Sequence, residues 1–251
     1  MVAHLTRRGK GIHPPAIRAV KLSYTAVVTS SSAARAPYSP TGRARYVRAP
    51  RVLHFPESAT VPESKRHLEL RTLLYQIVKH TFAGGSSIGC DQFVYFDASD
   101  PARCVAPDLF VRTGVPDSTF GSWKVWERGA PQLAVEVVSE SDAAQPSWNE
   151  KLARYHALGV EELVRFDPDG APGARLRVWD RVEGDLVERV VEQDVTACAV
   201  LGLWWVVRPG AGLDLALRLA RDPEGQDLLP TGQEAAERRV AELEQELRRR
   251  G

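Results

Sequence analysis

The chain has 251 residues, of which 43% are hydrophobic and 26% are charged, and its net charge is +1. These values are typical of a globular protein with one sizeable core, and no stretch approaches the roughly 20 apolar residues of a membrane-spanning helix. The three cysteines are far apart and odd in number, which argues against a disulfide framework or a structural zinc site. We therefore expect a cytoplasmic protein with no membrane partner.

The small net charge conceals a strong asymmetry along the chain. Residues 1–56 contain ten Lys or Arg and no Asp or Glu, whereas the remainder has 23 basic and 32 acidic residues. Such a segment is typical either of an arm that binds polyanions or of a disordered leader, and its Ser-, Pro- and Arg-rich composition favours the leader. We divide the chain into a basic, disordered leader at 1–56, a folded domain at 57–222, and a linker with a charged helix at 223–251.

The folded domain is expected to begin with a helix near Pro62. Apolar or small residues at 70, 74, 77 and 81 lie on one face at helical spacing, and two glycines after residue 83 end the helix. Glu63 falls in the first turn of this predicted helix, where an acid also stabilises the helix dipole. The spacing therefore places a carboxylate at the edge of whatever sheet the helix covers.

The remaining elements alternate between strands and helices, which predicts an α/β core. Residues 196–220 are apolar, and their second half fits a strand or a helix. The other predicted elements, in chain order, are strands at 88–97, 104–114 and 130–141, a helix at 146–158, a strand at 162–170, a hairpin at 175–191 around Glu183-Gly184, and a C-terminal helix at 233–250.

Two acids and one lysine stand out because of where they occur. Asp108 and Glu136 each lie in a strand-like apolar run, where a carboxylate is tolerated only if it is paired or bound to a cation. Mg²⁺ or Mn²⁺ between them would remove their repulsion, and Lys151 on the following helix could offset charge on a phosphoryl group. The alternative is structural: Asp108 caps a turn, Glu136 pairs with an arginine, and Lys151 is solvated.

The sequences of several segments favour the metal site, because they resemble those of a known family. The segments APDLFV, LAVEVVSES, KLARYHALGVEELVRFDP and ARDPEGQDLLPTGQEAAERR resemble the Uma-two family of bacterial endonucleases, within the restriction-endonuclease-like PD-(D/E)XK superfamily. The resemblance covers about residues 60–235 and leaves the basic leader outside. It implies a restriction-endonuclease-like mixed β-sheet flanked by helices, with a C-terminal helical tail.

The resemblance also implies roles for individual residues. Asp108 follows a proline, as in the PD motif, and Glu136 matches the (D/E) position. With Val137, these two residues make up the implied metal-ligand set. Glu63 matches the helical acid that assists in some members of the superfamily.

One position departs from the superfamily motif. The motif lysine should follow Glu136 by two residues, but Val138 stands there. Lys151, one helix later, matches the position from which this family supplies the lysine instead. The implied catalytic residues are therefore Asp108, Glu136, Lys151 and Glu63.

Two functions remain open at this point. The first is a Mg²⁺-dependent (or Mn²⁺-dependent) endonuclease that hydrolyses DNA as a homodimer. The second is a catalytically inactive nuclease fold that binds nucleic acid or a protein, which Val138 and the acidic balance of residues 57–251 favour. The isolated histidines His67, His80 and His156 lack metal-ligand spacing, and we interpret them as structural.

Overall fold

The structure is a computed structural model that describes residue 53, residues 63–139 and residues 147–250. The predicted basic leader lies outside these residues except for Leu53, as does the predicted helix start at Pro62. The domain boundaries proposed from the sequence stay predictions.

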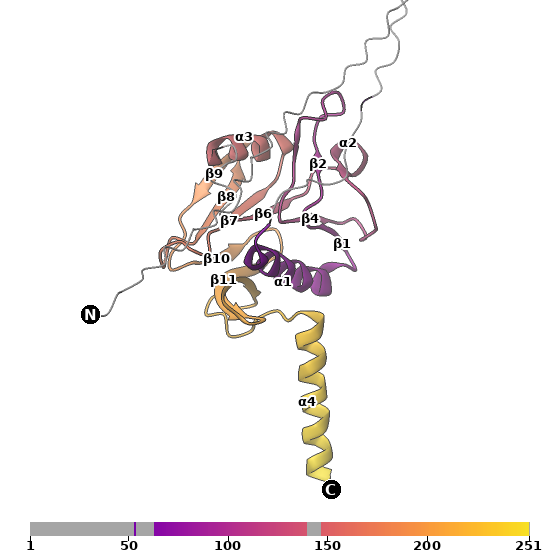
Figure 1. Ribbon diagram of the computed structural model, residues 1–251, viewed down its shortest axis with the longest axis vertical. Helices are drawn as coiled ribbons and strands as arrows, with labels where there is room; N and C mark the ends of the chain where they lie inside the picture. Colours follow the sequence, from indigo (N-terminus) through magenta and orange to yellow (C-terminus); the bar gives the residue numbers. More distant parts are fainter. Residues whose placement is uncertain (1–52, 54–62, 140–146, 251) are drawn as a thin grey trace, which may run out of the picture. The chain divides into compact units, whose positions relative to one another are not determined.

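Within the described residues, six strands form the main sheet in the order β1–β4–β6–β7–β8–β9 (Figure 1). β6 and β7 are parallel, and every other neighbouring pair in this sheet is antiparallel, so the sheet is mixed. The strands span Ser86–Gly89 (β1), Leu109–Thr113 (β4), Leu133–Val137 (β6), Glu162–Phe166 (β7), Leu176–Val182 (β8) and Asp185–Arg189 (β9).

Two smaller sheets and four helices complete the described part of the chain. One small sheet has the order β10–β11–β12 and the other β3–β2–β5. Their strands span Val94–Tyr95 (β2), Cys104–Val105 (β3), Trp123–Lys124 (β5), Val195–Cys198 (β10), Leu203–Gly210 (β11) and Leu213–Ala220 (β12). The helices span Lys65–Phe82 (α1), Val125–Arg128 (α2), Trp148–Leu158 (α3) and Gly232–Arg250 (α4).

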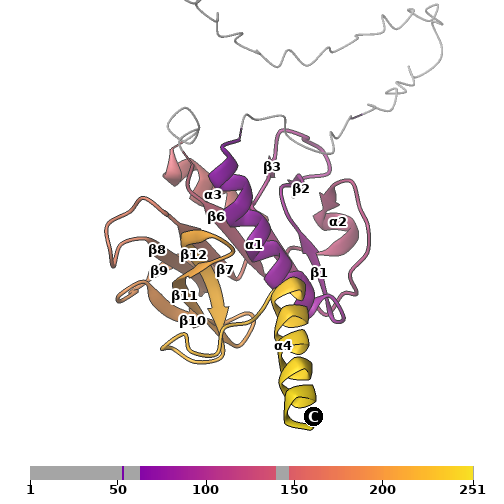
Figure 2. The ribbon, with the colours of Figure 1, turned by 60° about the horizontal axis from the view of Figure 1, so that its bottom comes forward.

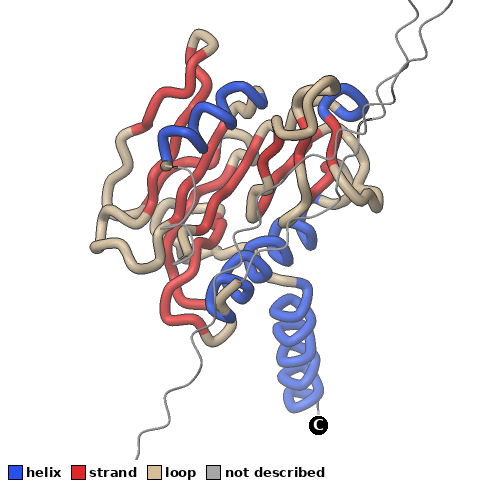
Figure 3. Tube along the Cα trace, turned by 45° about the horizontal axis from the view of Figure 1, so that its top comes forward, coloured by secondary structure: helices blue, strands red, loops and turns tan. Residues whose placement is uncertain are grey.

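The central strand β6 is covered on both faces, which explains its nearly continuous apolar sequence. Val135 and Val137 belong to the core under α1, β11 and β12, whereas Ala134 belongs to a second core that includes Tyr155 and Leu158 of α3. Alternate residues of a strand point to opposite faces, so α1 and α3 lie on opposite sides of the main sheet (Figure 3). A strand buried on both faces has no solvated side for a charge, and Glu136 therefore needs a partner within the protein.

The parallel β6–β7 pair requires a crossover, and α3 provides it. Ser147 is the N-cap of α3 and forms a capping box with Glu150, while Gly159 ends the helix in the left-handed conformation with φ 93°. The predicted end of this helix at residue 158 is thus confirmed. Its predicted start at Pro146 lies outside the described residues.

The first helix begins after Glu63, which the sequence analysis placed in its first turn. Ser64 is the N-cap of α1, its Oγ accepts a hydrogen bond from the backbone N–H of His67, and Lys65 is the first helical residue. Glu63 therefore precedes the helix and is not part of its first turn. The predicted stripe also ends earlier than expected, because Leu70, Leu74 and Ile77 are buried but residue 81 is exposed.

Two of the predicted strands are each interrupted. In 88–97, Asp91 has a φ of 62°, which turns the chain between β1 and β2. In 104–114, Pro107 has no N–H to donate to a ladder, and the chain leaves β3 before starting β4. Residues 196–220, left open from the sequence, form parts of β10, β11 and β12, so their second half is a strand.

The mixed α/β fold and the C-terminal helix predicted from the sequence are confirmed. The hairpin predicted at 175–191 is β8–β9, which turns at Glu183-Gly184. In the described part of the chain, no helix combines the length and apolar character needed to cross a membrane.

Candidate functional site

The two predicted acids lie side by side at the end of the main sheet. β4 and β6 pair with Leu109 opposite Val135, and one further step along this register places Asp108 opposite Glu136. The two carboxylates therefore lie close together at this end of the sheet, where Asp108 contacts α1 and Glu136 contacts α3. Asp108 and Glu136 are only 7% and 8% exposed, and each therefore depends on partners within the protein.

Asp108 is held by the strand that carries Glu136. Its Oδ2 accepts a hydrogen bond of 2.7 Å from the backbone N–H of Val137, which fixes the orientation of the carboxylate. Its Oδ1 lies 3.3 Å from Nε2 of His67. Asp108 therefore does not act as the turn cap considered from the sequence. Its carboxylate instead connects the neighbouring strand β6 with α1.

Glu136 is held by two side chains from one face of α3. Nζ of Lys151 donates to Oε2 over 3.0 Å, and the hydroxyl of Tyr155 donates to Oε1. Lys151 and Tyr155 are four residues apart, the spacing that places side chains on one helix face. Burial, together with the charge of Asp108, raises the pKa of Glu136 to about 7, although Lys151 and Tyr155 act in the opposite direction.

His67 lies in the middle of the site, which the sequence interpretation missed. Its Nε2 is 3.0 Å from the backbone carbonyl of Val137 as well as 3.3 Å from Asp108, and its Nδ1 is 2.7 Å from Glu63. Burial lowers the pKa of this ring, but the hydrogen bonds and charges of Asp108 and Glu63 outweigh it and raise the pKa to about 9. The ring is therefore an imidazolium that donates from both nitrogens at neutral pH.

Glu63 acts on this site through His67. Its carboxylate also forms a two-point ion pair with Arg71 on the next turns of α1, with Nη2 to Oε2 at 2.8 Å. Hydrogen bonding to Arg71 is the main reason why the pKa of Glu63 falls to about 2. Glu63 thus remains ionised and contacts His67, which in turn contacts Asp108.

The departure at Val138 has a structural counterpart. The N–H of Val138 donates to the carbonyl of Phe166, so this residue continues the pairing of β6 with β7 and brings no charge to the site. The amine that stands beside Glu136 comes from α3 instead, through Lys151. The structure therefore brings together Asp108, Glu136 and Lys151, as predicted from the sequence.

The neighbouring strand adds a second basic group that the sequence interpretation missed. Arg165 of β7 is directly opposite Glu136, and its guanidinium lies 5.5 Å from the ring centre of Trp148, the first residue of α3. Arg165 also pairs with Asp167 at 3.3 Å. Only the register between two strands far apart in sequence reveals this position.

The donor set is compatible with a hard divalent cation. Among the described residues, no group of three or more His, Cys, Asp or Glu side chains has a metal-binding arrangement. Mg²⁺, however, is commonly held by one or two carboxylates with waters completing the shell, and Asp108 and Glu136 supply two. The backbone carbonyl of Val137 is a further oxygen donor beside them. The positive charge at the site comes from His67, which contacts this carbonyl, and from Lys151, which contacts Glu136.

A family model described as "Uma2: Putative restriction endonuclease" matches residues 57–216. The chain belongs to this family. The resemblance inferred from APDLFV, LAVEVVSES and the later segments is thereby confirmed.

A solved structure is also similar to the chain. It is described as a crystal structure of "a putative nuclease" from Anabaena variabilis ATCC 29413, with 14% sequence identity and a TM-score of 0.41. The match covers 57% of this chain and 76% of that one. No curated protein matches the chain.

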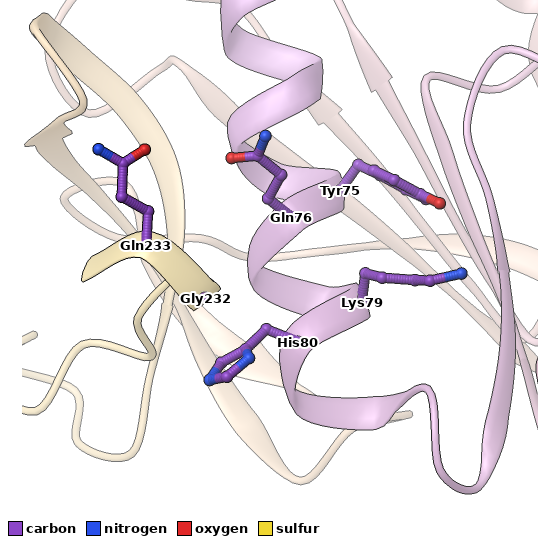
Figure 4. A pocket seen from close by; sticks show the side chains of 6 residues that line it. All are labelled: Tyr75, Gln76, Lys79, His80, Gly232 and Gln233. Atoms are coloured by element: carbon purple, nitrogen blue, oxygen red, sulfur yellow. The ribbon is translucent and has the colours of Figure 1, made fainter. Parts of the chain in front are cut away.

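A hollow elsewhere on the surface lies apart from the candidate site. It lies between α1 and the start of α4 and is lined by Tyr75, Gln76, Lys79, His80, Gly232 and Gln233 (Figure 4). Lys79 is twelve residues beyond His67, about 18 Å along the helix at 1.5 Å per residue. The hollow contains none of the residues predicted to be catalytic or metal-binding.

Proposed function

We propose that the protein is a Mg²⁺-dependent endonuclease that hydrolyses phosphodiester bonds in DNA. One observation carries the proposal: Asp108 and Glu136 lie at the same end of two paired, buried strands, with the amine of Lys151 3.0 Å from Glu136. Membership of the Uma2 family supports it, because the family is described as "Putative restriction endonuclease".

The metal site would consist of Asp108, Glu136 and the backbone carbonyl of Val137. A bound Mg²⁺ or Mn²⁺ would polarise the scissile phosphate and lower the pKa of an attacking water. Asp108 is already oriented by its hydrogen bond to the N–H of Val137, and Glu136 by the hydroxyl of Tyr155. These contacts hold the two carboxylates in fixed orientations, and a cation would have to displace the His67 imidazolium to reach Asp108 and the Val137 carbonyl.

Lys151 is the proposed electrostatic partner of the reacting phosphate. It approaches Glu136 from α3. Its ammonium would offset the negative charge that develops on the phosphoryl oxygens during attack. In this role Lys151 replaces the motif lysine, whose position is occupied by Val138.

Arg165 extends this positive charge along the sheet. It is opposite Glu136 on β7 and is well placed to contact a phosphate next to the scissile one. Local cations of this kind matter because residues 57–251 carry an excess of acidic residues. The basic leader would add affinity that does not depend on DNA sequence.

A cleavage assay tests the proposed function. Wild type, Asp108→Asn and Asp169→Asn are incubated with single- and double-stranded DNA in Mg²⁺, in Mn²⁺ and in EDTA. Asp169 is the matched control, because its side chain is 70% exposed and pairs with Arg66 outside the site. We expect cleavage by wild type and Asp169→Asn that disappears in EDTA and in Asp108→Asn. Equal cleavage by Asp108→Asn would exclude the proposed site.

The second candidate is a nuclease fold that binds nucleic acid or a protein without turnover. Val138 at the motif position favours it, as does His67, whose imidazolium already satisfies Asp108 and the Val137 carbonyl. In this case all three proteins would bind DNA equally and none would cleave it in any metal. The same assay, with a binding measurement added, therefore separates the two candidates.

A further inference from the structure

The C-terminal helix α4 is anchored to the domain only at its first turn. Thr231 and Glu234 form a reciprocal capping arrangement, with Thr231 Oγ1 accepting from the N–H of Glu234 over 3.0 Å and Glu234 Oε2 accepting from the N–H of Thr231 over 2.7 Å. The buried Arg218 of β12 donates to the same carboxylate. These contacts fix where the helix starts and in which direction it leaves the domain (Figure 2).

Beyond this turn, every described residue from Ala236 onward is exposed. The exposed residues include three large apolar side chains, since Val240, Leu243 and Leu247 are 56%, 42% and 72% exposed. α4 has 19 residues, and most of the stability of a helix in a protein comes from packing of its apolar face rather than from intrinsic propensity. The unpacked apolar face of α4 therefore calls for a partner.

The apolar residues follow the spacing of a coiled coil. Ala236, Val240, Leu243 and Leu247 are separated by 4, 3 and 4 residues, which assigns them to heptad positions d, a, d and a. Val240 at a and Leu243 at d is the combination that favours parallel two-stranded coils. The flanking g and e positions are then Arg239, Glu246, Glu237 and Glu244.

We propose that α4 pairs with α4 of a second copy of this chain, as a parallel two-stranded coiled coil. The inference goes beyond the nuclease proposal and does not depend on it. Charge complementarity favours a second copy of α4 as the partner and a parallel orientation of the two helices. In a parallel pair, Arg239 at g faces Glu244 at e of the other helix, and symmetry supplies this attraction twice.

An antiparallel pair is less favourable. It would place Arg239 opposite Glu246, which is attractive, but also Glu237 opposite Glu244, which is repulsive, each twice. The parallel pair has the same number of attractions and no repulsion among these positions. Its two anchored first turns would also hold both domains at the same end of the coil.

Contacts within the helix do not compete strongly with this pairing. Arg239 pairs with Glu242 at 3.2 Å and Glu244 with Arg248 at 3.4 Å, and all four side chains are more than half exposed. Exposed ion pairs of this kind contribute little. Arg239 and Glu244 are therefore available to a partner helix at small cost.

Sedimentation of the full-length protein over a concentration series tests the pairing. Leu243→Glu places a charge in the seam, whereas Gln245→Glu places the same charge on the outer face at position f. We expect wild type and Gln245→Glu to dimerise with the same affinity and Leu243→Glu to be monomeric. A monomeric wild type, or a Leu243→Glu variant that dimerises normally, would overturn the proposal. Both substitutions are exposed, so thermal unfolding of the domain should be unchanged in each variant.

Charge exchange tests the direction. In a parallel pair, Arg239→Glu and Glu244→Arg should each weaken dimerisation about tenfold, and the double exchange should dimerise better than either single variant. Each single change also introduces a like-charge pair within its own helix, and the double variant carries both, so only the contact between helices can restore affinity. In an antiparallel pair Glu244→Arg would strengthen the dimer, because it removes the Glu237–Glu244 repulsion. That result would overturn the parallel arrangement.

Discussion

Nζ of Lys151 lies 3.0 Å from Oε2 of Glu136, although one residue belongs to the crossover helix and the other to the central strand before it. The capping box at Ser147 and Glu150 fixes where α3 begins, and thereby which turn of the helix reaches the sheet. The motif lysine is absent from position 138, where Val138 stands, and the next helix, α3, supplies a lysine instead.

The first prediction concerns Lys151. We expect Lys151→Met to lower the cleavage rate by about 100-fold, the effect of removing one preorganised positive or donor group from a phosphoryl-transfer site. Metal binding should persist, because both carboxylates remain. Arg154→Met is the control, since Arg154 is exposed on the same helix. Unchanged cleavage in the lysine variant would remove Lys151 from the mechanism.

The second prediction concerns the pH dependence of stability. Burial raises the pKa of Glu136 from 4.5 to about 7, so between these values the folded protein holds a proton that the unfolded chain has released. The metal-free wild type therefore loses stability as the pH rises through this window, and Glu136→Gln lacks this loss. From pH 4.5 to 8, we expect the difference in unfolding free energy to shift toward the variant by about 1–3 kcal/mol. Denaturant titrations in EDTA measure it, and parallel pH profiles would contradict it.

The third prediction concerns His67. Because its imidazolium contacts Asp108 and the Val137 carbonyl, a metal ion has to displace it. We expect His67→Ala to bind Mn²⁺ about tenfold more tightly than wild type at neutral pH. Above the titration of Glu136 near pH 7, wild-type affinity should rise further as the pH approaches about 9, where His67 loses its proton, and the variant should lack this second rise.

Calorimetry on the His67 variant requires a control from the same helix. His80→Ala serves, because His80 lines the hollow at the other end of α1. Identical Mn²⁺ affinities in wild type and His67→Ala would show that the imidazolium does not compete with the metal.

The fourth prediction concerns Arg165. We expect Arg165→Gln to weaken DNA binding and to reduce the salt dependence of the binding constant by about one ion, with Mn²⁺ affinity unchanged. Arg221→Gln is the control, since Arg221 pairs with Asp227 in a loop after β12. If both variants bind DNA with the wild-type salt dependence, Arg165 makes no phosphate contact.

Much of the fold follows from local sequence patterns. The apolar run around Glu136 predicts a strand buried on both faces, and Gly159 predicts where α3 ends. The breaks at Asp91 and Pro107 were not anticipated, because the alternating or apolar pattern continues across both. Their causes are a left-handed backbone conformation at Asp91 and a missing backbone donor at Pro107.

The candidate site is predictable only in part. Asp108 and Glu136 stand out because a carboxylate in an apolar run needs a partner. His67 carried a usable signal, because it continues the buried stripe of α1 toward the N-terminus. Tyr155 carried a partial signal, because it follows Lys151 by four residues on one helix face. Arg165 carried none, since its proximity to Glu136 depends on strand register.

The most direct measurement is a calorimetric titration of Mn²⁺ into wild type, Asp108→Asn and Glu162→Gln. Glu162 is an equally buried acid on β7 whose carboxylate accepts from Trp205 at 2.9 Å and from the N–H of Val200 at 3.0 Å, away from the candidate site. The proposed metal centre requires wild type and Glu162→Gln to bind Mn²⁺ and Asp108→Asn to lose detectable binding. Wild-type affinity in Asp108→Asn would contradict the assignment of these carboxylates to a metal.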